Sequence, residues 1–301
     1  MPRIIQPDGY IKGDTTLFIG SEKTALIDTG MEYCSPQLVE DLKKELGDRP
    51  LDYILLTHSH YDHVCGVPAL RHAWPDVVVC AHPHAAKILA KESVRQFMMG
   101  MSAQNYEEMD PEHEVVGYPL EDYKVDLLVT EGSKIDLGDI CFRVIETPGH
   151  TKCSVSYYDE INQILFASES TGIACTTDPF SVEPTYVSSF VQSMESIRKL
   201  KDLPVKKIVQ SHRIIEKIQG VETYFERAET FAQLSCEFIL SMHRNGLDPK
   251  DILKIYADVF AKRVEGQPIY AFLVNAEGAI KTVIRESEAL GDEFLQFTNK
   301  N

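Results

Sequence analysis

The sequence lacks the features of membrane proteins and of nucleic-acid-binding proteins. No apolar run approaches the roughly 20 residues that cross a bilayer, and the opening Met-Pro-Arg-Ile-Ile-Gln contains no secretory hydrophobic segment. Basic residues are few, with 30 Lys and Arg against 46 Asp and Glu, and the formal net charge of −16 repels phosphate backbones. These absences predict a cytoplasmic protein with no membrane and no nucleic-acid partner.

The seven cysteines follow neither a disulfide pattern nor a structural-zinc pattern. They are odd in number and scattered, and no two of them are separated by two residues. We therefore interpret them as buried thiols in a reducing compartment. Because 44% of the 301 residues are apolar, the chain can bury a sizeable core, and its function must be sought in its motifs.

Strand-like and helix-like segments alternate over the first two thirds of the chain. Short β-branched or apolar runs bounded by Gly, Pro and Asp predict strands at 16–19, 24–27, 53–56 and 77–80. Amphipathic spacing predicts helices at 36–46, 67–73, 85–101 and 187–200. This alternation indicates sheets covered by helices, with the chemistry on loops at strand ends.

The last part of the chain has a mostly helical pattern. Apolar residues at helical intervals predict a helix at 221–242 that ends at Asn-Gly, and Asp-Pro opens another helix at 249–264. The segment 269–274 is β-prone but could equally begin a helix. We therefore divide the chain into a domain at 1–215 and a mostly helical extension at 216–301.

One motif brings metal-binding side chains together. A buried-strand pattern runs into Leu-Leu-Thr-His-Ser-His-Tyr-Asp-His, which ends at His63. An extended chain directs alternate side chains to one side, so His58, His60 and Asp62 can converge, and the following turn adds His63. These groups suit zinc, iron or manganese, and the absence of Cys argues against a closed structural zinc site. The alternative is a pair of surface histidines beside a helix start, with Asp62 as a cap.

Together with three further segments, this motif resembles the metallo-β-lactamase superfamily. The segment Thr-Ala-Leu-Ile-Asp-Thr-Gly resembles the strand whose acid, here Asp28, supports the metal site by orienting a ligand imidazole. The segment Thr-Pro-Gly-His-Thr resembles the next ligand loop and supplies His150. The segment Ile-Val-Gln-Ser-His resembles the last strand and supplies His212. The four elements occur in the family's order over residues 15–214.

The resemblance implies a fold and a ligand set. The fold is an α+β, four-layer αβ/βα sandwich with a binuclear metal site at the shared edge of its sheets, and here it would carry a helical C-terminal extension. The family pattern assigns one ion to His58, His60 and His150, and the other to Asp62, His63 and His212.

The sequence departs from the family pattern at the bridging acid. Where the family reads roughly Leu-Phe-x-Gly-Asp, this chain reads Leu-Phe-Ala-Ser-Glu and places Glu169. Glutamate is one methylene longer and must bend or withdraw to bridge two ions about 3.5 to 4 Å apart. Since alkylsulfatase-like branches use Glu ligands, we expect Glu169 to bind metal. A second departure, Arg213 in place of Gly, is either a surface charge or a group that faces an anionic substrate.

A helical insertion at about 85–118 is rich in flexible apolar side chains, including Phe97, Met98 and Met101. These side chains either fill an ordinary core or form a lid over the metal ions that accommodates an apolar part of the substrate. A second histidine pair, His82 and His84, flanks a proline after a predicted strand. We interpret this pair as capping or lining a pocket, not as a further metal site.

These observations predict a binuclear metal-dependent hydrolase. Two divalent ions, with zinc favoured over iron and manganese, would generate a bridging hydroxide that attacks a small ester, thioester, lactone or phosphodiester. Asp62 would orient the water or transfer a proton. The layout also resembles, more loosely, that of quinolone-response thioesterases. The extension lacks the Arg- and Asn-rich pattern of the glyoxalase II branch, which disfavours hydroxyacylglutathione as the substrate.

Two other functions remain open at this point. Some relatives bind iron through much the same ligands, so an iron-dependent redox or dioxygen protein is one alternative, although no flavin domain follows residue 216. The other alternative is a non-catalytic regulatory protein on the same fold. The expected partner is a small-molecule substrate, and the amphipathic helices of the extension would also suit a homodimer.

Overall fold

A computed structural model describes residues 3–5, 15–109, 119–175, 178, 180–210, 220–261 and 269–298. The chain forms two compact units that interleave along the sequence. The first unit contains Met1–Glu146, Val155–Phe166 and Lys206–Glu216, and the second contains Thr147–Ser154, Ala167–Val205 and Lys217–Asn301. The expected boundary near residue 216 lies outside the described residues. Within the described ranges, no helix is long and apolar enough to cross a membrane.

The first unit contains two β-sheets. The six-stranded sheet consists, in spatial order, of β1 (Arg3–Ile5), β2 (Thr16–Ile19), β3 (Thr24–Ile27), β4 (Tyr53–Leu55), β5 (Val78–Ala81) and β6 (Leu127–Leu128). The five-stranded sheet consists of β13 (Lys207–Val209), β10 (Ile164–Phe166), β9 (Val155–Asp159), β8 (Cys141–Glu146) and β7 (Lys134–Asp136). Strands β3 to β6 are parallel, which brings their carboxyl ends to one edge of the sheet.

The two sheets share one apolar core. Phe18 of β2 meets Phe142 of β8 edge to face, with ring centroids 4.9 Å apart. Tyr157 of β9 is fully buried and donates its hydroxyl to the carbonyl of Leu56, at 2.9 Å, just beyond β4. The predicted α+β class and its sheet-on-sheet sandwich are confirmed.

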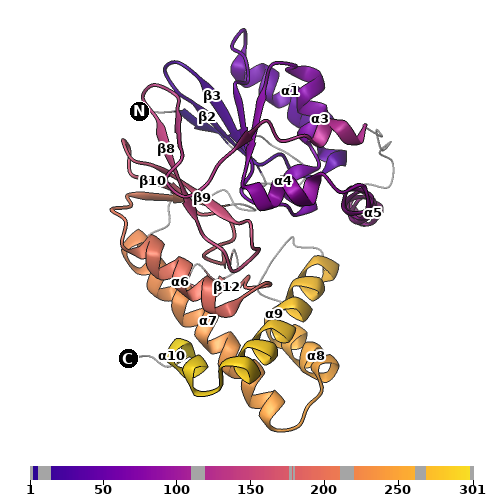
Figure 1. Ribbon diagram of the computed structural model, residues 1–301, viewed down its shortest axis with the longest axis vertical. Helices are drawn as coiled ribbons and strands as arrows, with labels where there is room; N and C mark the ends of the chain where they lie inside the picture. Colours follow the sequence, from indigo (N-terminus) through magenta and orange to yellow (C-terminus); the bar gives the residue numbers. More distant parts are fainter. Residues whose placement is uncertain are drawn as a thin grey trace. The chain divides into compact units, whose positions relative to one another are not determined.

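Helices cover the face of the six-stranded sheet that lies away from the five-stranded sheet (Figure 1). The helices next to the sheet include α1 (Ser35–Leu46), α3 (Val67–Ala73) and α4 (Pro83–Leu89). The same stretch of chain also forms α2 (Tyr61–Val64), α5 (Glu92–Met109) and the short 3-10 helices η1 (Glu32–Cys34) and η2 (Leu120–Tyr123). The sequence predicted one helix at 85–101, and the chain forms α4 and α5 instead. The Nδ1 atom of His82 accepts the backbone N–H of His84 at 3.1 Å, so the predicted capping role of this pair is confirmed.

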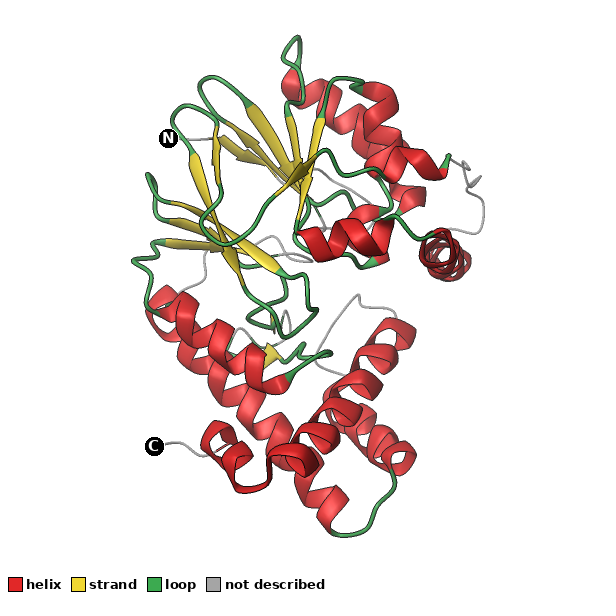
Figure 2. Ribbon diagram, in the orientation of Figure 1, coloured by secondary structure: helices red, strands yellow, loops and turns green. Residues whose placement is uncertain are grey.

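The second unit is mostly helical (Figure 2). Its elements are the hairpin β11 (Ile173–Ala174) and β12 (Val182–Glu183), followed by α6 (Phe190–Lys201), α7 (Val221–Arg244), α8 (Pro249–Phe260), α9 (Ile269–Leu290), η4 (Gly291–Phe294) and α10 (Leu295–Thr298). The side chain of Asp248 caps α8 by accepting two backbone N–H groups, at 2.8 and 3.0 Å. The ambiguous segment 269–274 begins α9, because Phe272 and the small residues after it pack into the helical core.

Candidate metal centre

The first group of candidate metal-ligand side chains lies just after the end of β4. We call His58, His60, Asp62 and His63 the first half-site. His58 is 1% exposed, and its ring centroid lies 4.6 Å from that of His60 and 4.1 Å from that of His63. His60 is the residue before the first turn of α2, which carries Asp62 and His63. The rings of the three histidines therefore lie close together within the first unit, and Oδ2 of Asp62 lies 3.6 Å from Nε2 of His63, whereas the metal-binding role of all four residues stays a prediction.

Asp28 organises the first half-site from beneath. It follows β3, is fully buried, and has a φ of 57°, a left-handed conformation that Asp adopts more readily than most residues. Its Oδ1 accepts the backbone N–H of Thr57 at 2.8 Å. Its Oδ2 lies 2.7 Å from the Thr57 hydroxyl and 2.8 Å from Nδ1 of His63. Asp28 thus holds both the motif's backbone and one of its imidazoles.

Hydrogen bonds determine which nitrogen of each imidazole carries the proton. The single hydroxyl proton of Thr57 goes to Asp28, so the Thr57 oxygen accepts from Nδ1 of His58 at 3.0 Å. Nδ1 of His63 likewise donates to Asp28. Both rings therefore keep the Nε2 lone pair as the ligand atom for a metal ion, an arrangement that is common among metal-binding histidines.

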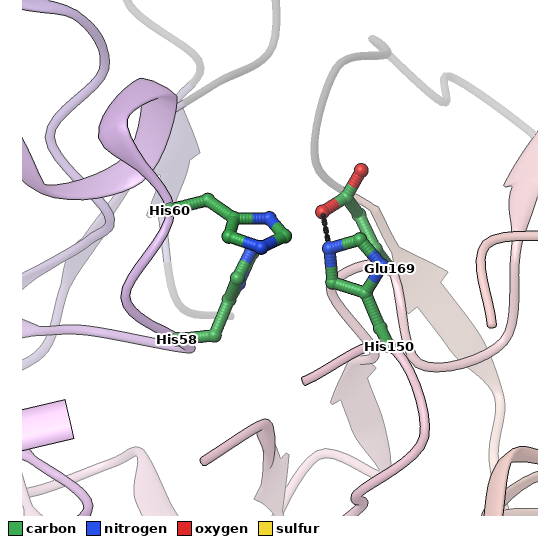
Figure 3. A group of neighbouring side chains, drawn as sticks. All are labelled: His58, His60, His150 and Glu169. Carbon is green, nitrogen blue, oxygen red and sulfur yellow. Dashed lines mark ion pairs between the residues drawn. The ribbon is translucent and has the colours of Figure 1, made fainter. Parts of the chain in front are cut away.

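The second half-site consists of His150 and Glu169, both in the second unit (Figure 3). Nδ1 of His150 lies 2.6 Å from the carbonyl oxygen of Thr185, which can only accept, so Nδ1 is the protonated nitrogen. Nε2 of His150 lies 2.7 Å from Oε2 of Glu169, and the two side chains are 1% and 4% exposed. A lone pair and a carboxylate oxygen at this distance repel each other unless a proton or a metal ion lies between them. Both atoms are therefore candidate ligands for one metal ion.

Backbone geometry presents these two side chains. Gly149 has a φ of 139°, and a Cβ there would lie 2.5 Å from Cα of Ser193, so only glycine fits before His150. Ser168 has a φ of 50°, which turns the chain just before Glu169. The hydroxyls of Thr147 and Ser170 lie 2.8 Å apart and connect the two loops.

The remaining predicted residues have mixed outcomes. His212 and Arg213 lie outside the described residues, so their roles stay predictions. In α5, Phe97 is 67% exposed, whereas Met98 and Met101 are buried, and the lid also stays a prediction. Sequence reasoning missed Thr57 and Thr185. A hydroxyl residue directly before the first histidine could have pointed to Thr57, but no motif surrounds Thr185.

The donor set suits a divalent transition metal. The first unit offers ligand atoms from His58 and His60, and the second unit offers ligand atoms from His150 and Glu169. Imidazole nitrogens and carboxylate oxygens are ligands of zinc, iron and manganese, and an all-His and carboxylate set is typical of sites that keep a position open for chemistry.

Known proteins are similar to this chain in sequence. The family model of the metallo-beta-lactamase superfamily matches residues 9–212. A hydroxyacylglutathione hydrolase from Rhodopseudomonas palustris (strain BisB5) is 29% identical over 205 residues, which are 68% of this chain and 61% of that relative's length. The acyl-coenzyme A thioesterase MBLAC2 of Homo sapiens is 26% identical over 205 residues, which cover 64% of this chain and 70% of that protein.

A solved structure has the same fold. It is that of a metallo-beta-lactamase family protein from Thermus thermophilus, with a TM-score of 0.60, 20% identity, and coverage of 96% of this chain and 93% of that one. The family model covers more than half of the chain and includes the histidine motif, Asp28, His150 and Glu169. The chain therefore belongs to the metallo-beta-lactamase superfamily.

Proposed function

We propose that this protein is a hydrolase that uses two divalent metal ions, with zinc favoured, to cleave a small acyl thioester. The observation that carries the proposal is the protonation pattern of three buried imidazoles. Each of His58, His63 and His150 commits Nδ1–H to an oxygen acceptor and keeps Nε2 as a ligand atom. One buried histidine with this pattern would be ordinary, whereas three histidines that all use Nδ1–H in a hydrogen bond and keep Nε2 as the acceptor nitrogen support ion binding.

The ligand assignment follows the family pattern. His58, His60 and His150 would hold one ion, and Asp62, His63 and His212 the other, with Glu169 as the additional acid. Bound divalent ions supply a water of lowered pKa and polarise the oxygen of the scissile group. Asp28 and Thr57 hold the rings of His58 and His63 in place.

Asp62 is the residue of the first half-site best suited to move a proton. Its side chain is 19% exposed, whereas His63 beside it is fully buried, and its Oδ2 lies 3.6 Å from Nε2 of His63. A partly solvated carboxylate can orient a water molecule and accept its proton. We therefore assign this role to Asp62.

The thioester substrate class is supported by the names of two relatives, the hydroxyacylglutathione hydrolase and the acyl-coenzyme A thioesterase. Both names describe hydrolysis of a thioester. The matched region spans only 61% of the first relative, and the helical extension lacks the Arg- and Asn-rich pattern of glyoxalase II. An acyl thioester other than hydroxyacylglutathione is therefore the favoured substrate.

Metal analysis and a substrate panel test the proposal. Protein grown with ample zinc, iron and manganese should carry metal in stoichiometric amounts and hydrolyse acyl thioesters faster than nitrophenyl esters, lactones or bis(nitrophenyl) phosphate. His60→Ala and His150→Ala should each lose metal and activity. A protein that contains none of the three metals, or that is unaffected by both substitutions, would contradict the proposal. A strong optical spectrum of bound iron without hydrolysis would favour the redox alternative.

A further inference from the structure

Residues 182–189, which we call the strap, contact both members of the second half-site. Thr185 lies in the strap and is 4% exposed. Its carbonyl accepts Nδ1–H of His150 at 2.6 Å, and its hydroxyl donates to the backbone carbonyl of Glu169. Further along the strap, the backbone N–H of Ser188 donates to the carbonyl of Gly149 at 2.9 Å. A displacement of the strap would therefore move both ligands.

One face of α9 directs its polar groups to the end of the strap. The Thr282 hydroxyl donates to the carbonyl of Val187 at 2.7 Å, and the Arg285 guanidinium donates to the carbonyl of Ser188 at 2.8 Å. The Glu286 carboxylate accepts the first backbone N–H groups of α6, at 2.9 and 3.2 Å. Positions 282, 285 and 286 share one helical face, so α9 aligns this segment along its length.

Close packing and a buried hydroxyl pair reinforce this contact. A Cβ at Gly278 of α9 would lie 2.5 Å from Cγ1 of Val187, so a side chain at this position would collide with the Val187 side chain. Next to Thr185, the hydroxyl of Tyr186 lies 2.7 Å from that of Ser235 in α7, and both residues are fully buried. Buried contacts with the packed helices therefore hold the strap, in addition to the exposed hydrogen bond from Arg285.

Helix α7 also reaches the turn that carries Glu169. Tyr224 is fully buried, and its hydroxyl lies 3.3 Å from the carbonyl oxygens of both Thr171 and Gly172 and 3.1 Å from the Thr171 hydroxyl. These two residues follow Glu169 within one turn of chain. The same helical core thus reaches the acid from one side and the histidine, through the strap, from the other.

We propose that the C-terminal helices position the second half-site, with Tyr224 and Thr282 as the positioning residues for Glu169 and His150. This inference rests on the proposed function, since it concerns the residues that would hold the metal. Ligands on loops bind an ion well only when surrounding hydrogen bonds fix their orientation. In this protein the C-terminal helices supply that support. The extension therefore contributes to the metal centre and is not merely appended to it.

The test compares cobalt binding by matched variants of the full chain. Thr282→Val removes the hydroxyl that reaches the strap, and Tyr224→Phe removes the hydroxyl that reaches the Glu169 turn. Each should weaken Co²⁺ binding, measured against a competing chelator, by about ten-fold or more and should change the visible spectrum of the bound cobalt. Thr282→Ser keeps the hydroxyl and should restore wild-type binding.

Thr298→Val is the matched control. Thr298 is also buried, and its hydroxyl also donates to a backbone carbonyl, that of Leu295, but this bond lies within the C-terminal residues and not at the strap. The control should lose some thermal stability and keep cobalt affinity within about two-fold, a difference too small to indicate a lost ligand.

The outcomes separate the two proposals. If both variants bind cobalt as the wild type does, with the same spectrum, the positioning role is wrong and the proposed function stands. If the wild-type protein itself binds no cobalt, the proposed function and the positioning role are both wrong. If Thr282→Val does not fold, Tyr224→Phe, which removes a single oxygen atom, decides the result.

Discussion

Removing the hydroxyl of Thr57 should uncouple the first half-site from its support. Thr57→Val keeps the size and branching of a fully buried side chain but removes the oxygen that donates to Asp28 at 2.7 Å and accepts from His58 at 3.0 Å. The bond to the carboxylate is worth about 1.5 to 3 kcal/mol and the bond to the imidazole about 0.5 to 1.5 kcal/mol. We expect the free energy of unfolding to fall by roughly 2 to 4 kcal/mol.

Metal binding should respond separately from stability. Without its acceptor, the His58 ring can rotate or change tautomer, and loss of such a partner weakens metal binding by about 10- to 100-fold, equivalent to about 1.4 to 2.7 kcal/mol. Urea unfolding of the metal-free protein measures the first effect, and zinc titration against a chelator measures the second. Thr57→Ser is the control and should retain both properties.

The reasoning would be refuted by a Thr57→Val protein that is destabilised but binds zinc with wild-type affinity. That result would mean that the hydroxyl serves the fold alone and that His58 keeps its orientation through packing. A variant with unchanged stability would refute the assignment of the buried hydrogen bonds themselves.

Three further predictions concern other parts of the chain. Gly149→Ala should destabilise the protein by roughly 2 to 6 kcal/mol and abolish stoichiometric metal binding, because the new Cβ would collide with the Ser193 backbone at a φ of 139°. Urea unfolding and metal analysis measure the two effects, and a variant with normal metal content would contradict the prediction. Glu169→Gln should weaken zinc binding but leave the metal-free protein at least as stable as the wild type, because the amide N–H can donate to Nε2 of His150. Calorimetry with and without zinc tests this prediction, and equal zinc affinity of the variant and the wild type would exclude Glu169 as a ligand. Burial raises the pKa of Cys80 to about 12, so folding favours the neutral thiol and the free energy of unfolding should fall as pH rises from about 9 toward 12. Between pH 8 and pH 11, the urea midpoint should fall less for Cys80→Ala than for the wild type, and an equal fall would show that other groups dominate.

Local features of the chain follow directly from the sequence. The strands Thr16–Ile19 and Thr24–Ile27 and the helix Val67–Ala73 have the bounds that their apolar patterns predicted. The three histidine rings of the motif lie close together because the motif spans six residues between the end of β4 and the single turn of α2. Short sequence separation makes such geometry a property of the local backbone.

The tertiary structure decided the features that depend on contacts between residues far apart in the sequence. The segment 269–274 has β-prone residues, yet it is helical, because burial of Phe272 in the helical core outweighs weak local propensity. Likewise, Thr185 meets His150 across 35 residues, and no pattern around Thr185 marks it as a support. A hydrogen bond between residues distant in sequence forms only when the packing of the elements brings them together. No short sequence motif reveals such a contact.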